Sequence, residues 1–312
     1  MSTQRRERLL VEIAASGERL DRYLVQSLAP TSRKVIKRAL DKGQVFVDGC
    51  CVLRAGTLLH GGETLELTLE GEAPPPVVPQ LTVLWQDESL LAINKPAGLP
   101  AHPTVSGRPN ALDLVSELVA GKGGGMRPIL LHRLDADTTG LLLFALTREA
   151  NLSLSRQFSE HQIEKRYLAL VSGLPPASFA VDNYLKAGVR GRTVAVQSGG
   201  LAAQTDFRTL AVQEGVALVE ARPRTGRTHQ IRAHLAGAGC PLLGDSLYGG
   251  ISSISTRTGV IALPRHLLHA SSVLLTHPQR SVRQSLVAPL PDDFLRILQV
   301  LAIDTNTVDF PQ

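Results

Sequence analysis

The stretch that decides the fold is His132–Gly140, HRLDADTTG. It lies between two short apolar runs, Ile129–Leu131 and Leu141–Leu146. Runs that are so short and so apolar are typical of strands buried on both faces of a sheet. The polar stretch between them is therefore predicted to be a loop held by rigid scaffold, which is where binding and catalytic residues are usually placed.

The composition is that of an ordinary globular protein, with 43% hydrophobic and 20% charged residues among 312. The net charge of +5 favours a polyanionic partner, although only weakly. Cys50, Cys51 and Cys240 form no C-x-x-C pair and no even set, which argues against a disulfide framework and a zinc site. We find no signal peptide and no run of about 18 apolar residues, and we expect a cytoplasmic protein.

The chain is expected to have two domains, in line with a prior of about 150 residues per domain. Residues 1–15 are predicted to be an N-terminal tail, and residues 16–70 a small domain of two helices followed by a hairpin. Residues 71–80, which contain three consecutive prolines, are predicted to be a linker. Residues 81–302 form the larger domain, and residues 303–312 a C-terminal tail.

The second predicted helix carries a basic outer face, formed by Arg33, Lys34, Lys37, Arg38 and Lys42. A solvated basic face is the simple interpretation. However, the sequence places no matching row of acidic residues there, and clustered like charge favours an external anion. The segments GERLDRYL and SRKVIKRALDKGQVFVDG, with the order of helix, helix and hairpin, resemble the αL-motif RNA-binding domain of a ribosomal protein. That resemblance implies that the five basic side chains bind RNA.

The larger domain shows apolar patterns for several strands and helices. The strands are predicted at 81–85, 90–94, 164–173, 205–210 and 216–221, and the helices at 111–119, 148–160 and 229–238. The segment 121–125, with four glycines, is predicted to be a hinge, and residues 174–200 give little signal. A mixed sheet flanked by helices is the expected architecture.

Three separated segments resemble the RluA-type RNA pseudouridine synthases: HRLD at 132–135, K-x-Y at 165–167, and RPRTGRTHQIR at 222–232. Thr139 stands where the usual family signature, H-R-L-D-x-x-T-S-G, has serine, and it keeps the hydroxyl. The resemblance implies an α+β chain whose catalytic domain has a mixed, mainly antiparallel central sheet. It also implies an enzyme that isomerises specific uridines to pseudouridine, most often in large-subunit ribosomal RNA, with transfer RNA as the alternative.

The resemblance also implies roles for individual residues. Asp135 is the expected catalytic aspartate, Tyr167 the active-site tyrosine, and Arg232 the arginine that pairs with the aspartate. A buried carboxylate must stay ionised to act at the sugar, and a guanidinium beside it opposes the rise in pKa that burial causes. The isomerisation requires no metal and no cofactor.

Four further residues are candidate substrate contacts: Arg133, His132, Arg227 and His229. Because a stacked base is inaccessible, the target uridine should flip out, and Arg133 could fill the vacated place. The two histidines also fit a simpler role as hydrogen-bonding residues of a loop and a helix, since no carboxylate-rich ligand set surrounds them.

Simpler interpretations exist for each catalytic candidate taken alone. Asp135 could brace a turn, Tyr167 could belong to the core, and Arg232 could be solvated. Their joint match to the family order favours the functional interpretation. Gly244–Leu247 spells a serine-hydrolase tetrapeptide, but it falls late in the chain and is better explained as a turn. The remaining alternative is an RNA-binding or ribosome-assembly factor without catalysis. We expect a monomer whose partner is RNA.

Overall fold

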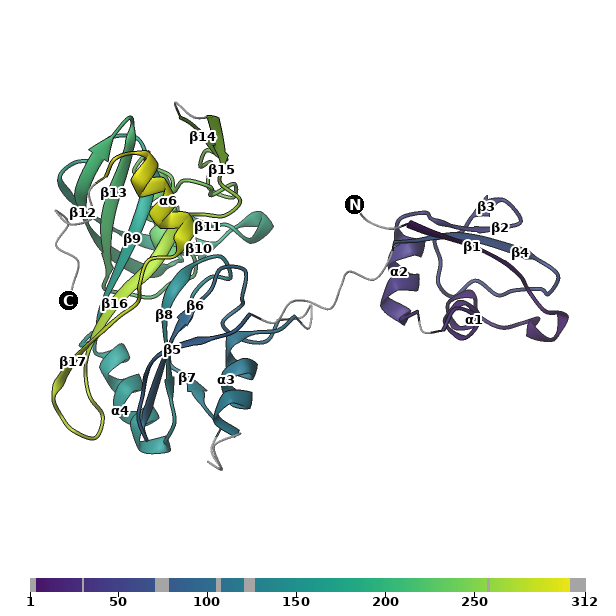
Figure 1. The fold of residues 1–312 in the computed structure, drawn as a ribbon, viewed down its shortest axis with the longest axis horizontal. Helices are drawn as coiled ribbons and strands as arrows, with labels where there is room; N and C mark the ends of the chain where they lie inside the picture. The colour runs from purple at the N-terminus through teal and green to yellow at the C-terminus, as the bar shows by residue number, and fades with distance from the viewer. Residues whose placement is uncertain are drawn as a thin grey trace. The chain divides into compact units, whose positions relative to one another are not determined.

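The computed structural model describes residues 4–29, 31–70, 79–104, 108–120, 127–256 and 259–303. The chain folds into two compact units, residues 1–77 and 78–312 (Figure 1). The division falls within the segment predicted to be a linker, of which residues 71–78 lie outside the described residues. The predicted hinge at 121–125 and residues 304–312 of the predicted C-terminal tail also lie outside them.

The N-terminal unit packs two helices, α1 (Leu20–Ser27) and α2 (Arg33–Asp41), against a four-stranded antiparallel sheet. The strand order is β1-β4-β2-β3, with bounds Gln4–Leu10, Thr64–Glu70, Val45–Val47 and Cys50–Cys51. The core lies between the sheet and the apolar stripes of both helices, as the spacing of leucines predicted. A short 3₁₀ helix, Ile13–Ala15, joins β1 to α1.

The prediction of a loose tail that leads into a short strand at Leu9–Ile13 is wrong for residues 4–15. Gln4–Leu10 is a complete edge strand, paired with Thr64–Glu70 along its whole length. Its sequence, QRRERLL, shows no hydrophobic alternation because the backbone ladder holds it and its side chains are largely charged, as is common at sheet edges. Arg8, for example, reaches Glu66 on the neighbouring strand at 3.3 Å.

The C-terminal unit is built on an eleven-stranded sheet of order β11-β10-β12-β13-β9-β16-β8-β6-β5, with β17 beside β16 and β7 beside β8. All its strand pairs are antiparallel except β16 and β8. The strand bounds are Thr82–Gln86 (β5), Leu90–Lys95 (β6), Ile129–Leu130 (β7), Thr139–Ala145 (β8), Glu164–Ser172 (β9), Ser178–Ala187 (β10), Thr193–Val196 (β11), Leu201–Gln213 (β12), Val216–Pro223 (β13), Leu268–Thr276 (β16) and Arg283–Val287 (β17).

Helices cover both faces of this sheet. They are α3 (Ala111–Ala120), α4 (Arg148–Ser159), α5 (Gln230–Gly237) and α6 (Asp292–Val300), with a 3₁₀ turn at Val189–Gly191 and a small hairpin of β14 (Ser253–Thr256) and β15 (Gly259–Ala262). Alternation along β9 sends Tyr167 toward the core that contains α3 and α5, and Leu168 toward the core that contains α6. The α+β fold with a mixed, mainly antiparallel sheet is confirmed.

Two predictions for this unit need correction. Ile129–Leu131 is not a strand buried on both faces. β6 pairs along one side of β8 and β16 takes the start of the other. β7 and the following Leu131 therefore reach only the end of β8, from Leu143 to Ala145, and Ile129 is 38% exposed. β8 itself is fully buried, as predicted. Ile303, assigned to the C-terminal tail, is buried against the core that contains α6.

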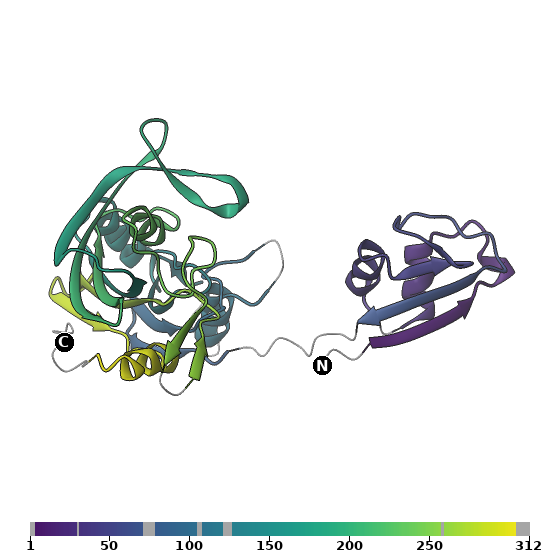
Figure 2. The ribbon, with the colours of Figure 1, turned by 90° about the horizontal axis from the view of Figure 1, so that it is seen from above.

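The segment 174–200 contains strands β10 and β11, which the sequence did not reveal. Phe179, Val181 and Leu185 alternate along β10, but Asn183 interrupts this apolar set and most side chains are exposed or half-buried, so the pattern is weak. Figure 2 shows β10, β11 and the start of β12 (teal to green) as a ribbon that curves away from the body of the unit.

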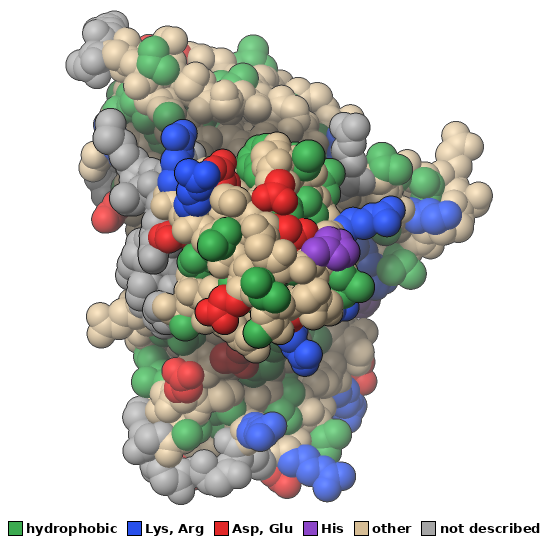
Figure 3. Space-filling view, turned by 90° about the vertical axis from the view of Figure 1, so that its right-hand side faces the viewer, with side chains coloured by type: hydrophobic (Ala, Val, Ile, Leu, Met, Phe, Trp, Pro, Cys, Tyr) green, Lys and Arg blue, Asp and Glu red, His purple; other side chains and the backbone are tan. Residues whose placement is uncertain are grey.

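The polarity of one face and the lengths of the helices bear on whether the chain can cross a membrane. On the face drawn in Figure 3, hydrophobic side chains are scattered among basic and acidic ones. Within the described residues, no helix is long and apolar enough to cross a membrane.

Candidate active site

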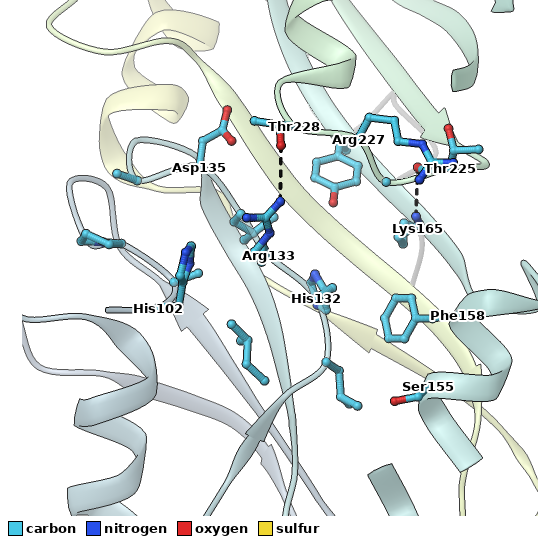
Figure 4. A pocket seen from close by; sticks show the side chains of 18 of the residues that line it. His102, His132, Arg133, Asp135, Ser155, Phe158, Lys165, Thr225, Arg227 and Thr228 are labelled. Atoms are coloured by element: carbon cyan, nitrogen blue, oxygen red, sulfur yellow. Dashed lines mark hydrogen bonds between the residues drawn. The ribbon is translucent and has the colours of Figure 1, made fainter. Parts of the chain in front are cut away.

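Asp135 lies in the loop between β7 and β8, at a cavity of about 1100 Å³ (Figure 4). Its carboxylate Oδ2 accepts a hydrogen bond of 2.9 Å from Nη1 of Arg232 on α5. The Asp135 side chain is 25% exposed, whereas that of Arg232 is 8% exposed. The cavity thus presents a carboxylate that a buried guanidinium holds from behind, as the sequence predicted for this pair.

Asp245 is the functional candidate that the sequence analysis missed. Its two carboxylate oxygens accept hydrogen bonds of 2.7 and 2.9 Å from Nε and Nη2 of Arg232, and it is 1% exposed. This bidentate pair fixes the guanidinium plane and leaves Nη1 for Asp135. Burial opposes the charge on Arg232, but the hydrogen bonds to Asp245 and Asp135 outweigh it and raise the pKa of Arg232. Asp245 lies in the tetrapeptide Gly244–Leu247, which does form a turn.

Tyr167 extends from β9 into the same cavity and is 8% exposed. Burial raises the pKa of its hydroxyl, and the negative charge of Asp135 raises it further. The hydroxyl therefore keeps its proton at neutral pH, and the ring offers an apolar surface beside the carboxylate.

The other predicted contacts surround this centre. Nη2 of Arg133 lies 3.3 Å from Oγ1 of Thr228, across the cavity entrance (Figure 4). His229 precedes α5 with φ of 54° and places Nε2 3.7 Å from Oδ2 of Asp135. His132 accepts a hydrogen bond at Nε2 from the backbone of Leu143, and burial lowers its pKa to about 3, so the ring is neutral. Arg227 is exposed, and its Nε donates to the carbonyl of Ala202.

Two buried basic side chains hold the backbone of the Asp135 loop. Lys95, at the end of β6, is fully buried and donates from Nζ to the carbonyl oxygens of Ala136 at 2.7 Å, Leu99 at 2.8 Å and Pro96 at 2.9 Å. Nη1 of Arg265 donates to the carbonyl of Asp137 at 3.1 Å. These contacts turn two consecutive loop carbonyls away from solvent and set the direction of the Asp135 side chain.

Replacing Lys95 with methionine should destabilise the C-terminal unit by about 3 kcal/mol, taking ~1 kcal/mol for each buried carbonyl that loses its donor. Urea unfolding followed by the fluorescence of Trp85, the single tryptophan, measures this. Lys186→Met, on the exposed side of β10, is the matched control and should change stability by less than about 0.5 kcal/mol. Equal effects of the two variants would contradict the role given to Lys95.

Two buried histidines hold the threonines that end the loop. Oγ1 of Thr138 lies 2.8 Å from Nε2 of His266, and Oγ1 of Thr139 lies 2.9 Å from Nδ1 of His269. Because Nε2 of His269 faces the carbonyl of Ala288 at 3.2 Å, Nε2 carries the proton and Nδ1 accepts from the threonine hydroxyl. Thr139, in place of the usual serine, thus provides the hydroxyl that this contact needs.

The stability of the C-terminal unit should fall as pH decreases from about 6.5 to 4. Burial lowers the pKa of both His266 and His269 to about 4, so they stay neutral in the fold while the unfolded chain takes up protons below about 6.5. Each contributes up to ~1.4 kcal/mol per pH unit in that window. Urea midpoints across this range measure the slope, which His269→Gln should reduce by about one proton; an unchanged slope would contradict the assignment.

Comparison with known proteins places this site in a family. A model of the RNA pseudouridylate synthase family matches residues 89–237. The ribosomal large subunit pseudouridine synthase D of Pseudomonas aeruginosa is 35% identical over 305 residues, which cover 94% of this chain and 95% of the relative. The chain belongs to the RluA-type RNA pseudouridine synthases. It is therefore an enzyme, an isomerase of uridine in RNA, as the three matching segments predicted.

Other relatives of the synthase agree. An uncharacterized RNA pseudouridine synthase of Chloroflexus aurantiacus is 36% identical over 306 residues, which cover 94% of this chain and 93% of the relative. The solved structure of human RNA Pseudouridylate Synthase Domain Containing 4 superimposes with a TM-score of 0.58 at 30% identity. It covers 72% of this chain and 94% of that protein. Within the described residues of the synthase, no cluster of His, Cys, Asp or Glu could hold a metal ion.

Proposed function

We propose that this synthase isomerises specific uridines of large-subunit ribosomal RNA, with Asp135 as its catalytic carboxylate. The observation that carries the proposal is the Asp135–Arg232–Asp245 arrangement at a cavity that also contains Tyr167. The substrate class is inferred from relatives named as ribosomal large subunit synthases, among them those of Pseudomonas aeruginosa and Zymomonas mobilis. Transfer RNA is the second candidate substrate.

The reaction breaks the bond between N1 of uracil and C1′ of the ribose and forms a bond between C5 and C1′. The C5 proton leaves, N1 gains a proton, and the atoms balance without a co-reactant. Asp135, held by the hydrogen bond from Arg232, acts at the sugar as nucleophile or base. Tyr167 provides a face for the uracil ring and a protonated hydroxyl for proton transfer. No cofactor is needed.

The target base must leave its stack to reach Asp135, at a cost of roughly a few kcal/mol. Arg133 is exposed at the entrance and its planar guanidinium can occupy the vacated place. Arg227 and His132 line the same cavity, Arg227 as a cation for the RNA backbone and His132 as a neutral ring. His229, beside Asp135, helps to position that carboxylate.

The basic face of α2 is proposed to dock RNA, because its five basic side chains are all exposed. Replacing Lys34 and Lys37 with glutamine should weaken RNA binding and lower the slope of log affinity against log salt by about 0.9 for each lost phosphate contact. Titrations at several salt concentrations measure this. The pair Arg6→Gln and Arg22→Gln, exposed in the same unit, removes the same charge and should leave the slope unchanged.

Purified synthase acting on unmodified transcripts tests the substrate proposal. We expect pseudouridine in the large-subunit ribosomal transcript and none in a pool of transfer RNA transcripts. Product in transfer RNA alone would establish the second candidate instead. We further propose that the synthase is a cytoplasmic monomer, because its proposed substrate is found there and the site is complete within one chain.

A further inference from the structure

The cavity at Asp135 is larger than one flipped uridine requires. Its volume of about 1100 Å³ is at the upper end of the ~300–1,000 Å³ range of sites that hold a drug-sized ligand. One arm of the cavity extends to α4, where Ser155, Phe158 and Ser159 line it. Figure 4 shows Ser155 and Phe158 at the end of the view away from Asp135. We call this part the α4 arm.

Two aromatic rings form one wall of the α4 arm. The rings of His132 and Phe158 lie with centroids 5.4 Å apart and planes at 36°. Both residues are half-buried and both line the cavity. The His132 ring is neutral and its orientation is fixed by the hydrogen bond from Leu143, so the pair presents rigid π surface. Such surface binds an unpaired nucleobase of any sequence.

A cation lies beside these rings. Nζ of Lys165 donates to the carbonyl of Thr225 at 3.3 Å, and within the described part of the chain no other hydrogen bond to this ammonium is found (Figure 4). Two of its N–H groups therefore remain for a ligand. Among the described residues, the cavity is lined by the acidic Asp135 and by five Lys and Arg side chains: Arg108, Arg133, Lys165, Arg224 and Arg227. This charge balance favours a phosphate group over a neutral ligand.

We infer that the α4 arm binds a second unpaired nucleotide, the neighbour of the target uridine in the RNA strand. Its base stacks on the His132–Phe158 surface, and its phosphate contacts Lys165. The inference rests on the proposed function, since the target uridine is taken to lie at Asp135. It adds a requirement for the substrate: the modified uridine must have a neighbour that can also leave its helix, as in a loop.

Equilibrium binding tests the site without relying on turnover. The probe is a short RNA stem-loop whose loop consists of uridines, compared with the same RNA carrying an abasic residue at each loop position in turn. Phe158→Leu keeps the apolar volume and removes the ring, whereas Phe158→Trp keeps a stacking surface. Leu152→Ala, on an exposed position of the same helix, is the matched control.

Phe158→Leu should weaken binding of the uridine loop about tenfold, within the ~1–3 kcal/mol range of base stacking. Phe158→Trp and Leu152→Ala should bind within about twofold of the wild type. At one abasic position the wild type should lose affinity by the same factor, and Phe158→Leu should lose nothing more. If Phe158→Leu lost the same additional affinity with every abasic RNA, no loop base would stack on Phe158, and the proposed site would be refuted.

Lys165 provides a second and independent measurement. Lys165→Gln should lower the salt slope of binding by about 0.7, the value for one phosphate of a single strand, and Lys165→Arg should restore it. An unchanged salt slope would show that Lys165 does not contact a phosphate of the RNA. Both measurements are of binding, so their outcome is separate from the test of the proposed substrate. A loss of affinity at one abasic position supports the site even if large-subunit transcripts are not modified. Modification of those transcripts without such a loss refutes the site and leaves the proposed function standing.

Discussion

Replacing Asp135 with alanine is expected to slow pseudouridine formation by about 10⁴-fold or more and to leave RNA affinity within about tenfold of the wild type. The carboxylate is the group proposed to act on the sugar, and among the residues that the structure describes no other acidic side chain lines the cavity. Its contribution to ground-state binding is small, since a negative charge does not attract RNA. Single-turnover rates at saturating RNA, together with equilibrium binding, separate the two effects.

Asp137 offers a control two residues away. Its side chain is exposed and does not line the cavity, while its backbone carbonyl is the atom that Arg265 holds. Asp137→Ala should therefore retain activity within about threefold, by the small effect usual at exposed positions. If Asp135→Ala lowers RNA affinity by as large a factor as it lowers the rate, the role of Asp135 is to bind RNA.

The second large effect is expected from Arg232→Met, which leaves the buried Asp245 carboxylate without its cationic partner. Breaking a buried pair in this way costs about 3–5 kcal/mol of stability. Activity should fall by about 10²-fold or more, because Asp135 loses the guanidinium that fixes the direction of its carboxylate. Urea unfolding monitored through Trp85 and single-turnover rates measure the two consequences.

A double variant separates stability from catalysis at this position. Arg232→Met with Asp245→Leu removes both charges, and replacing a buried ion pair by apolar residues is often neutral or stabilising. We expect stability to return to within about 1 kcal/mol of the wild type, while activity stays low. Recovery of activity together with stability would show that Arg232 supports the fold alone.

The parts of the site that the sequence could predict are those close together in the chain or in a known motif. The segment HRLDADTTG predicted the loop and its aspartate, and the apolar run Leu141–Leu146 predicted the buried strand that follows. Arg232 could be expected because it ends a segment that resembles the family. The apolar stripes of α1 and α2 likewise sufficed for the core of the N-terminal unit.

The contacts that hold the loop could not be predicted in the same way. Lys95 and Arg265 reach the carbonyls of Ala136 and Asp137 from segments far away in sequence, and a backbone acceptor leaves no mark on composition. The sequence analysis did not identify Asp245, because a turn fully explained the tetrapeptide Gly244–Leu247 in which it lies. Its pairing with Arg232 depends on how the chain between β13 and β16 crosses the sheet.

Gly140 is a position at which a tertiary contact, rather than local sequence, requires glycine. Its φ is 107°, and a Cβ there would lie 2.2 Å from the carbonyl oxygen of Ala270 on β16. β8 and β16 run parallel at this point, and their close approach brings Thr139 to His269. The glycine of the signature therefore permits the strand contact that fixes the end of the catalytic loop.

One measurement tests the central claim most directly: a map of pseudouridines in the ribosomal and transfer RNA of a strain that lacks this gene, complemented with wild type or with Asp135→Ala. The account predicts that sites in large-subunit ribosomal RNA disappear in the deletion strain, return with the wild type, and stay absent with the variant at equal protein level. Restoration of those sites by Asp135→Ala would contradict the assignment of Asp135 as the catalytic carboxylate.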